Sequence, residues 1–324
     1  MNFGNKIGRL KSALVNLITF TKRTKTKVIN NKKYGIIDIG SNSVRAILCQ
    51  GGKILYKNTL TTRLGEGLAQ SGVIGQGGFD RSLSAITKLF YILINEGADE
   101  IFSFATEAVR SAKNGKEFTL AVKNAVGMEV DVVSGDGEGE LGLLGALNGK
   151  DGGVIDIGGA SAEISVAKGS EIIYSHSLPL GAVRLYDWCG EEEEKLDEVI
   201  EKSIDEYGKV PQYVDYYAIG GTATTIGFID AGIEKYDENI VDGRVITLER
   251  LGEIYQKLRS LSVEERVKKL HINPKRAEII VGGVYLLKKI MLKFGINKVT
   301  VSEGDNLIGY YKKKICGEGY VKKS

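Results

Sequence analysis

YGIIDIGSNSVRAILCQGGKILY, residues 34–56, aligns without gaps on GGVIDIGGASAEISVAKGSEIIY, residues 152–174, so the chain contains an internal repeat spaced by 118 positions. Nine of the 23 aligned positions are identical. Each copy has an apolar stretch, a turn of small residues after an aspartate, and two further apolar stretches separated by a glycine-containing turn. Two copies with so long a period do not fit a solenoid. The repeat therefore predicts two homologous domains that face each other.

The turns of the two copies, GSNS at 40–43 and GGAS at 158–161, have the composition of phosphate-binding loops. Small residues let backbone N–H groups approach a phosphate, and serine and asparagine side chains add donors. One such turn would suggest an ordinary hairpin, but two copies in register favour phosphate binding. Asp38 and Asp156 precede the turns at strand ends, where each is placed to hold Mg²⁺ through water. The candidate phosphate ligands are Ser41, Asn42, Ser43, Gly158, Gly159 and Ser161.

The rest of the chain alternates between helical and strand patterns, which predicts an α/β fold. Apolar residues at helical spacing predict helices at about 78–97, 275–294 and 306–315. Strands are expected at 100–106 and 128–135.

A further anion site is predicted within residues 216–227, YYAIGGTATTIG, where a strand runs into a helix that begins with glycines. The start of a helix presents unpaired N–H groups and the positive end of the helix dipole. Gly221 and Thr222 are the candidate phosphate ligands at this helix start.

Composition and charge exclude several classes of protein. The 324 residues are 43% hydrophobic and 26% charged, which suits two domains and excludes a disordered or collagen-like chain. The net charge of +3 comes from basic ends: residues 1–33 hold nine Lys or Arg and no acid, whereas residues 34–311 hold 30 basic and 40 acidic side chains. An acidic body does not indicate nucleic acid binding, so no nucleic acid partner is expected.

The N-terminal extension, residues 1–33, carries a basic amphipathic pattern. Phe3, Ile7, Leu10 and Leu14 recur at helical spacing with lysines and arginines between them. A helix of this kind lies on an anionic membrane surface or docks on the protein. A partly helical or frayed extension is the favoured interpretation, and membrane contact stays open.

Cysteine and histidine usage favours a reducing, cytoplasmic location. Cys49, Cys189 and Cys316 are widely spaced, which fits neither a disulfide framework nor a thiolate zinc site. His176 and His271 are too far apart in the sequence to suggest a zinc site. No apolar run reaches the length of a membrane span.

Seven motifs between about residues 34 and 311 resemble, in order, those of the exopolyphosphatase and guanosine pentaphosphate phosphatase (Ppx/GppA) family within the actin, Hsp70 and sugar kinase superfamily. The motifs are IIDIGSNSVR (36–45), FATEAVRSAKN (104–114), VVSGDGEGE (132–140), VIDIGGASAE (154–163), SLPLGAVRL (177–185), IGGTATTIG (219–227) and IIVGGVYLLKKIM (279–291). The resemblance implies two actin-like, ribonuclease H-like domains that flank a central cleft. The first domain would cover residues 34–148 plus a C-terminal helix at about 305–324, and the second residues 149–304.

The resemblance also implies a hydrolase that releases orthophosphate from the terminal phosphoanhydride of polyphosphate with Mg²⁺, or with Mn²⁺. Glu138 falls on the catalytic glutamate of the family and would act as general base on the attacking water. Asp156 and Glu163 are expected near the metal and this water, with Asp38 as a further metal ligand. Arg45 and Arg110 join the phosphate ligands.

The chain departs from the family pattern in two segments. In SGDGEGE (134–140), Gly137, Gly139 and Glu140 replace the Glu, Ala and Arg of the family's SGxEEAR. Near residues 302–311, Leu307 and Ile308 replace the Arg-Glu of the family's LREG. These changes bear on rate and substrate preference more than on fold.

Three functions remain open on the sequence. The leading hypothesis is an exopolyphosphatase, and the second is a guanosine pentaphosphate 5'-phosphohydrolase with the same machinery. The third is a polyphosphate-binding or nucleotide-binding sensor of the same fold with little activity. The turn motifs do not decide among these functions, and a homodimer stays open.

Overall fold

The computed structural model describes residues 31–212 and 214–322. The amphipathic pattern predicted within residues 1–33 therefore falls almost wholly outside the described residues. Among the helices of the described part, none has the length and apolar character required to cross a bilayer.

The first sheet is built from strands in the N-terminal part of the chain. Its strands are β1 (Lys33–Ile39), β2 (Ser43–Gln50), β3 (Lys53–Thr61), β4 (Glu100–Ala105) and β5 (Val130–Val132), in the order β3-β2-β1-β4-β5. Side chains alternate across β1, so that Ile37 and Ile39 pack against α3 (Gln76–Asn95) and α5 (Gly115–Val126). Ile36 on the opposite face joins a second cluster. Both faces of this sheet are therefore covered.

The second sheet has seven strands. They are β6 (Gly152–Ile157), β7 (Ala162–Lys168), β8 (Glu171–Leu178), β9 (Tyr216–Ile219), β10 (Val245–Thr247), β11 (Lys298–Val301) and β12 (Val321–Lys322), in the order β10-β11-β9-β6-β7-β8-β12. The largest core of the described residues lies on one face of this sheet, beneath α8 (Glu193–Ile204), α9 (Gly220–Ala231), α11 (Leu248–Arg259) and α14 (Ile280–Phe294).

The sheet topology confirms the internal repeat and the predicted α/β fold of two actin-like units. In each copy, the first strand pairs antiparallel with the second and parallel with the fourth: β1 with β2 and β4, and β6 with β7 and β9. The register is also the same, because Asp38 lies opposite Arg45 in the first hairpin and Asp156 lies opposite Glu163 in the second. The two predicted turns therefore occupy equivalent places in the two sheets.

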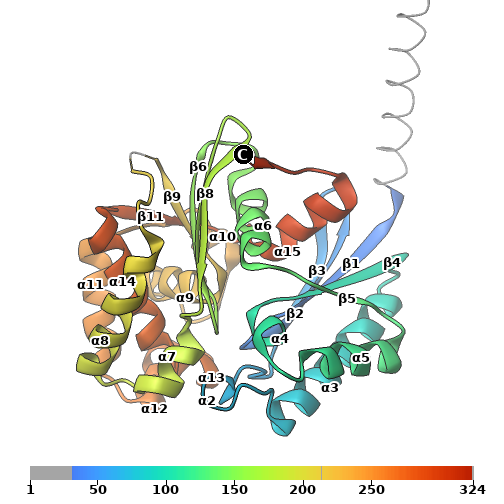
Figure 1. Cartoon of the computed structure of the whole chain (residues 1–324), viewed down its shortest axis with the longest axis horizontal. Coiled ribbons are helices and arrows are strands. Elements are labelled where there is room, and N and C mark those ends of the chain that lie inside the picture. The colour runs from blue at the N-terminus through green and yellow to red at the C-terminus, as the bar shows by residue number, and fades with distance from the viewer. Residues whose placement is uncertain (1–30, 213, 323–324) are drawn as a thin grey trace, which may run out of the picture.

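Two helices lie between the sheets. In Figure 1, α6 (Gly135–Leu147) and α15 (Asn306–Tyr311) occupy the centre of the molecule. Leu141 of α6 packs into the first sheet, whereas Leu143 and Leu147 pack against β6, β7, β8 and β9 of the second. The two helices approach closely, since a Cβ at Gly145 would overlap the backbone of Asp305. Residues that start these helices are therefore held between the sheets.

Shorter helices complete the fold, and two predicted helices need correction. The remaining elements are α2 (Leu68–Ser71), α4 (Glu107–Ser111), α7 (Ala182–Cys189), α10 (Glu238–Val241), α12 (Val263–Leu270), α13 (Pro274–Ala277) and two single turns, Asp205–Tyr207 and Lys312–Cys316. The helix predicted at 275–294 is two helices, α13 and α14, because the chain breaks at Glu278 and Ile279. The last predicted helix ends at Tyr311 and continues as a π-helical turn.

Candidate active site

A cavity of about 260 Å³ lies between the two sheets and brings together most of the predicted site. It is lined by both predicted turns, by Glu138 at the start of α6, and by the first residues of α9. All the predicted site residues line it except Arg110 and Thr222. The repeat predicted the two turns of this lining, whereas Glu138 and Glu163 were expected from the family resemblance and Gly221 from the helix start.

The two turns face each other at close range. Gly40 N–H donates to the Ser43 carbonyl and Gly158 N–H to the Ser161 carbonyl, so both turns close in the same way. A Cβ at Gly159 would lie 2.9 Å from Ser41 Cβ, so only glycine fits at this contact. The small residues of the turns thus allow backbone donors from both sheets to converge on one place.

Glu138 lies in the first turn of α6, which Ser134 caps by accepting a hydrogen bond from Gly137 N–H at 3.1 Å. The carboxylate is 6% exposed and accepts a hydrogen bond from Arg110 Nη1 at 2.7 Å. Burial raises the pKa of Glu138 to about 8, although Arg110 opposes the shift. A carboxylate with a pKa near neutrality is suited to accept a proton from water.

The glycine that follows Glu138 has a packing role. A Cβ at Gly139 would overlap the hydroxyl of Ser165, because α6 lies directly against β7 and β8 at this point. Gly139, which replaces the family's alanine, therefore allows α6 to pack closely against the second sheet.

Asp156 and Glu163 lie opposite each other on β6 and β7, which places both carboxylates on the same face of the hairpin. They are 9% and 3% exposed. Burial raises the pKa of Asp156 to about 7, and burial together with the charges of Glu138 and Asp156 raises the pKa of Glu163 well above its ordinary value. These carboxylates repel one another, so the cavity favours a cation or a proton among them.

We expect Glu163→Gln to stabilise the metal-free protein at alkaline pH. The pKa of Glu163 is raised in the folded state, so ionising this group costs folding free energy once the pH exceeds its ordinary value. Glutamine avoids this cost and still accepts the hydrogen bond that Ser177 donates to Glu163. In EDTA at pH 8.5 the thermal midpoint should rise by several degrees, since about 1 kcal/mol shifts a large domain by about 2–4 °C.

The difference between the two proteins should narrow as the pH falls toward the ordinary glutamate pKa of about 4.3. A lower midpoint for Glu163→Gln than for the wild type at pH 8.5 would contradict the raised pKa. Thermal unfolding followed by circular dichroism at several pH values measures both effects.

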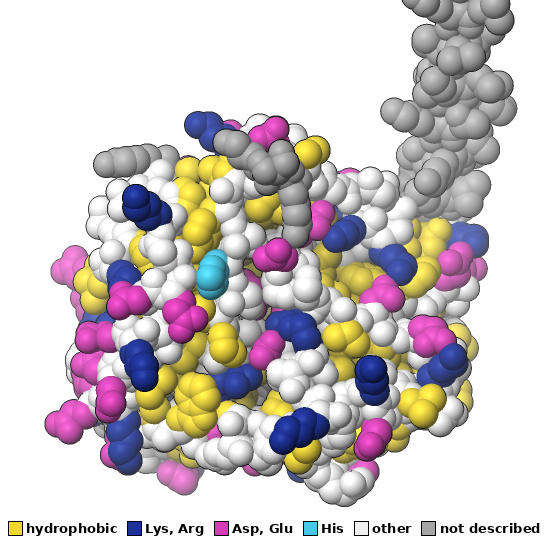
Figure 2. All heavy atoms as spheres, in the orientation of Figure 1, with side chains coloured by type: hydrophobic (Ala, Val, Ile, Leu, Met, Phe, Trp, Pro, Cys, Tyr) yellow, Lys and Arg dark blue, Asp and Glu magenta, His cyan; other side chains and the backbone are white. Residues whose placement is uncertain are grey.

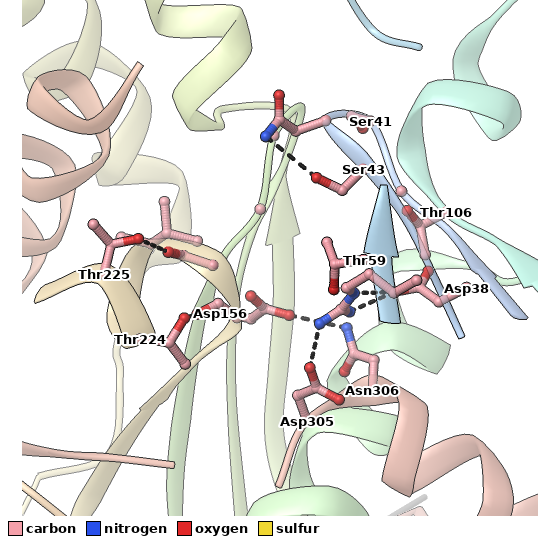
Figure 3. Close-up of a pocket in the computed structure, with 18 of the residues that line it drawn as sticks. Asp38, Ser41, Ser43, Thr59, Thr106, Asp156, Thr224, Thr225, Asp305 and Asn306 are labelled. Carbon is pink, nitrogen blue, oxygen red and sulfur yellow. Dashed lines mark hydrogen bonds and ion pairs between the residues drawn. The ribbon is translucent and has the colours of Figure 1, made fainter. Parts of the chain in front are cut away.

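Arg45 is engaged by two carboxylates. Its Nε donates to Asp38 Oδ2 at 2.9 Å, and its two Nη groups donate to Asp38 and to Asp305. Asp38 and Asp305, the two acceptors, are labelled in Figure 3. Burial alone would lower the pKa of Arg45, but Asp305 and Asp38 raise it above its ordinary value. The structure thus places this predicted phosphate ligand in the cavity with its charge already compensated.

Arg276 is a cation in the same cavity that the sequence reasoning missed. Among the residues that the structure describes, none forms a hydrogen bond or ion pair with its guanidinium, which lies where a side chain at Gly221 would be. Burial and the charge of Arg45 lower the pKa of Arg276 to about 10. An unpaired guanidinium beside the two turns predicted to bind phosphate is suited to bind an anionic ligand.

Two predicted phosphate ligands lie elsewhere. Arg110 donates to Glu138 and Glu107 and does not line the cavity. Thr222 is buried and donates to the Ile157 carbonyl, whereas Thr224 and Thr225 line the cavity. The predicted helix start is therefore present, but the threonines that line the cavity lie two and three residues further along, are half-buried, and donate their hydroxyls to the carbonyls of Gly220 and Gly221.

The segment at 302–311 contributes polar groups that the sequence reasoning also missed. Leu307 is buried in the core beside α6, so the departure from LREG affects packing. Asp305 and Asn306, one step earlier, line the cavity, and Asn306 Nδ2 donates to Asp156 Oδ2 at 2.9 Å. They follow β11 by a few residues, and β11 lies parallel to β9. Polar residues shortly after an apolar strand pattern are the sequence signal that could have identified them.

The donor set of the cavity fits a divalent cation bound together with a substrate. No group of three or more His, Cys, Asp or Glu in residues 31–212 and 214–322 is arranged to hold a metal ion alone. Asp38 Oδ1 is nevertheless buried without a partner in that part of the chain, and Asp156 and Glu163 repel each other nearby. One or two carboxylates plus substrate phosphates and water are the usual ligands of Mg²⁺.

Comparison with known proteins identifies similar chains. Residues 44–305 match the model of the Ppx/GppA phosphatase family. Exopolyphosphatase 2 of Mycobacterium tuberculosis is 27% identical over 305 residues, covering 84% of this chain and 95% of that protein. A bifunctional 3-dehydroquinate synthase/phosphatase of Fusobacterium nucleatum is 27% identical over 312 residues, covering 87% of this chain, which spans about half (46%) of that protein.

Among solved structures, an Aquifex aeolicus member of the Ppx/GppA family is 27% identical with a TM-score of 0.72, covering 88% of this chain and 98% of that one. An exopolyphosphatase from Cytophaga hutchinsonii is 23% identical with a TM-score of 0.74, covering 88% and 98%. The second likeness concerns the fold alone.

Proposed function

Because this chain belongs to the Ppx/GppA phosphatase family, we propose that it hydrolyses the terminal phosphoanhydride bond of inorganic polyphosphate and releases orthophosphate. Relatives named exopolyphosphatase and guanosine-5'-triphosphate,3'-diphosphate pyrophosphatase are hydrolases of phosphoanhydride bonds. The observation that carries the proposal is the cavity in which two opposed turns, a buried glutamate and an unpaired arginine meet.

The charges of the cavity support a dependence on a divalent cation. Six carboxylates line it, and three basic side chains oppose them. A polyphosphate end would be repelled by this excess of negative charge unless cations accompany it. On the face shown in Figure 2, acidic and basic side chains are interspersed. That face therefore has no stripe of basic side chains that could take the place of the metal cations.

Mg²⁺ is the cofactor we propose, and one or two of the carboxylates of Asp38, Asp156 and Glu163 would hold it together with water and substrate phosphates. When bound, the cation would neutralise the oxygens of the phosphates and favour attack at the terminal phosphorus. The backbone N–H groups of the two turns and the Arg276 guanidinium would bind the terminal phosphate oxygens.

Glu138 would act as the general base. Its ionised carboxylate would accept a proton from the attacking water, and Arg110 holds this carboxylate in place through a hydrogen bond of 2.7 Å. Glu107, which pairs with Arg110 and Arg184, extends the same network to α7. The base is therefore oriented by residues from both sides of the cavity.

Orthophosphate release from long-chain polyphosphate tests the proposal. We expect release with Mg²⁺ or Mn²⁺, and loss of at least about 100-fold in EDTA, because metal charge compensation supplies several kcal/mol. Guanosine pentaphosphate and ATP serve as comparison substrates. No release from any of the three substrates would exclude the enzyme and leave a binding or sensor role.

Hydrolysis of guanosine pentaphosphate is the second candidate function. Tyr236 lines the cavity and is 46% exposed, which leaves its ring accessible for stacking on a base. A relative from Photobacterium profundum that is 24% identical, with 84% of this chain aligned to 57% of that protein, is named as a guanosine-5'-triphosphate,3'-diphosphate pyrophosphatase. A higher kcat/KM for the nucleotide than for polyphosphate would favour this function.

A further inference from the structure

The cavity contains two arginines in opposite electrostatic states. Arg276 has no ion-pair partner among the described residues, whereas Arg45 donates to Asp38 and Asp305. One positive charge between two carboxylates leaves the group as a whole negative. A phosphate approaching Arg45 would therefore meet repulsion from Asp38 and Asp305, and would have to displace one of them.

Asp305 is held in this arrangement by the start of α15. Its Oδ1 accepts a hydrogen bond from Leu307 N–H at 3.0 Å and so caps the helix, while its Oδ2 pairs with Arg45. The backbone of Asp305 is fixed as well, because it packs directly on Gly145 of α6. The carboxylate thus has both oxygens engaged and little freedom to turn away.

Asp38 and Asp305 reach Arg45 from different parts of the chain. Asp38 lies directly opposite Arg45 in the hairpin of the first sheet, so this pair forms within one element. Asp305 reaches Arg45 from a distant part of the chain and adds the second negative charge. Removing the Asp305 charge would leave a one-to-one pair and free one face of the guanidinium.

We propose that Asp305 is a specificity-determining residue that withholds Arg45 from the phosphates of the substrate and leaves Arg276 as the main cation for them. The inference rests on the proposed function for the identity of the substrate. Its consequence is that the cavity binds polyanions weakly in the absence of metal. Ligands that carry additional phosphates near Arg45 gain no affinity from this residue.

The variant Asp305→Asn tests the inference, because asparagine keeps the helix cap and the side-chain size but removes the charge. The probe is inorganic tripolyphosphate, with the dissociation constant measured by calorimetry on the full chain in EDTA at low salt. We expect about tenfold tighter binding for Asp305→Asn, because a freed guanidinium adds a charge-assisted hydrogen bond. The gain should shrink at high salt.

Two controls and one substitute variant accompany this measurement. Glu318→Gln removes the same charge from an exposed position and should leave binding unchanged. The double variant Arg45→Gln/Asp305→Asn should lose the gain, because the freed guanidinium is absent. Asp305→Ser also retains a capping hydroxyl and replaces Asp305→Asn if that variant fails to fold. Circular dichroism confirms folding of each protein.

The outcomes separate this inference from the proposed function. Tighter tripolyphosphate binding by Asp305→Asn supports the inference, even if neither protein releases orthophosphate from polyphosphate. Unchanged or weaker binding overturns it, even if both proteins are active. A gain that persists in the double variant also overturns it, because that gain would not arise from Arg45.

Discussion

Replacing Glu138 by glutamine should lower kcat for polyphosphate hydrolysis by about 10³-fold, within the range of 10²–10⁴ that general bases contribute. The carboxylate is buried in the cavity wall, and its raised pKa of about 8 shows how strongly the site favours a proton there. Glutamine keeps the size of the side chain and accepts from Arg110, so KM should change little. Initial rates of orthophosphate release over a range of polyphosphate concentrations give both constants.

Glu140 provides a matched control on the same helix. Its carboxylate accepts from Lys313 at 2.7 Å and does not line the cavity, so Glu140→Gln should keep kcat close to the wild-type value. Equal losses in the two variants would point to damage to α6. A Glu138→Gln protein with wild-type kcat would remove Glu138 from the mechanism.

Replacing Arg276 by glutamine should raise KM for polyphosphate by about 10- to 100-fold, the range expected when one charged hydrogen bond is lost. Arg276 has no competing partner in the part of the chain that the structure describes, so its binding capacity is directed to the ligand. The side chain is not placed as a proton acceptor, and kcat at saturation should change much less. The same rate measurements separate the two effects.

Lys275 is the neighbouring cation and serves as the control. Its Nζ donates to the Thr61 carbonyl at 2.9 Å and it does not line the cavity, so Lys275→Gln should leave KM nearly unchanged. If both variants raised KM equally, a general loss of positive charge would explain the effect. A fall in kcat with constant KM would contradict the role of Arg276 in binding.

Much of the site could be predicted because the repeat places it at equivalent strand ends. Asp38 and Asp156 precede turns of the same composition, and each turn follows a strand with the same neighbours in its sheet. Glu138 could be assigned through the family resemblance. Glu138 lies near Asp156 and Glu163 because α6 packs between the two sheets. No local pattern in the sequence predicts that packing.

The residues that were missed reach the cavity through long-range contacts. Asp305 and Arg45 are 260 positions apart, and no periodicity links them. Arg276 lies in a helix of four residues, separated from α14 by a break that the continuous apolar pattern conceals. The helix-start pattern predicts Thr222 in the site, but its hydroxyl donates a hydrogen bond to the Ile157 carbonyl and does not line the cavity.

The position of α6 between two sheets means that many of its contacts can form only after later segments of the chain have been synthesised. Leu143 and Leu147 bury themselves against strands that follow α6 in the chain, so a nascent chain that ends at α6 exposes them to water. Asp305 and Asn306 arrive only after β11 has been synthesised. The cavity is therefore completed by the last part of the chain, and the same part supplies Leu307, Tyr310 and Tyr311, which cover one face of the first sheet.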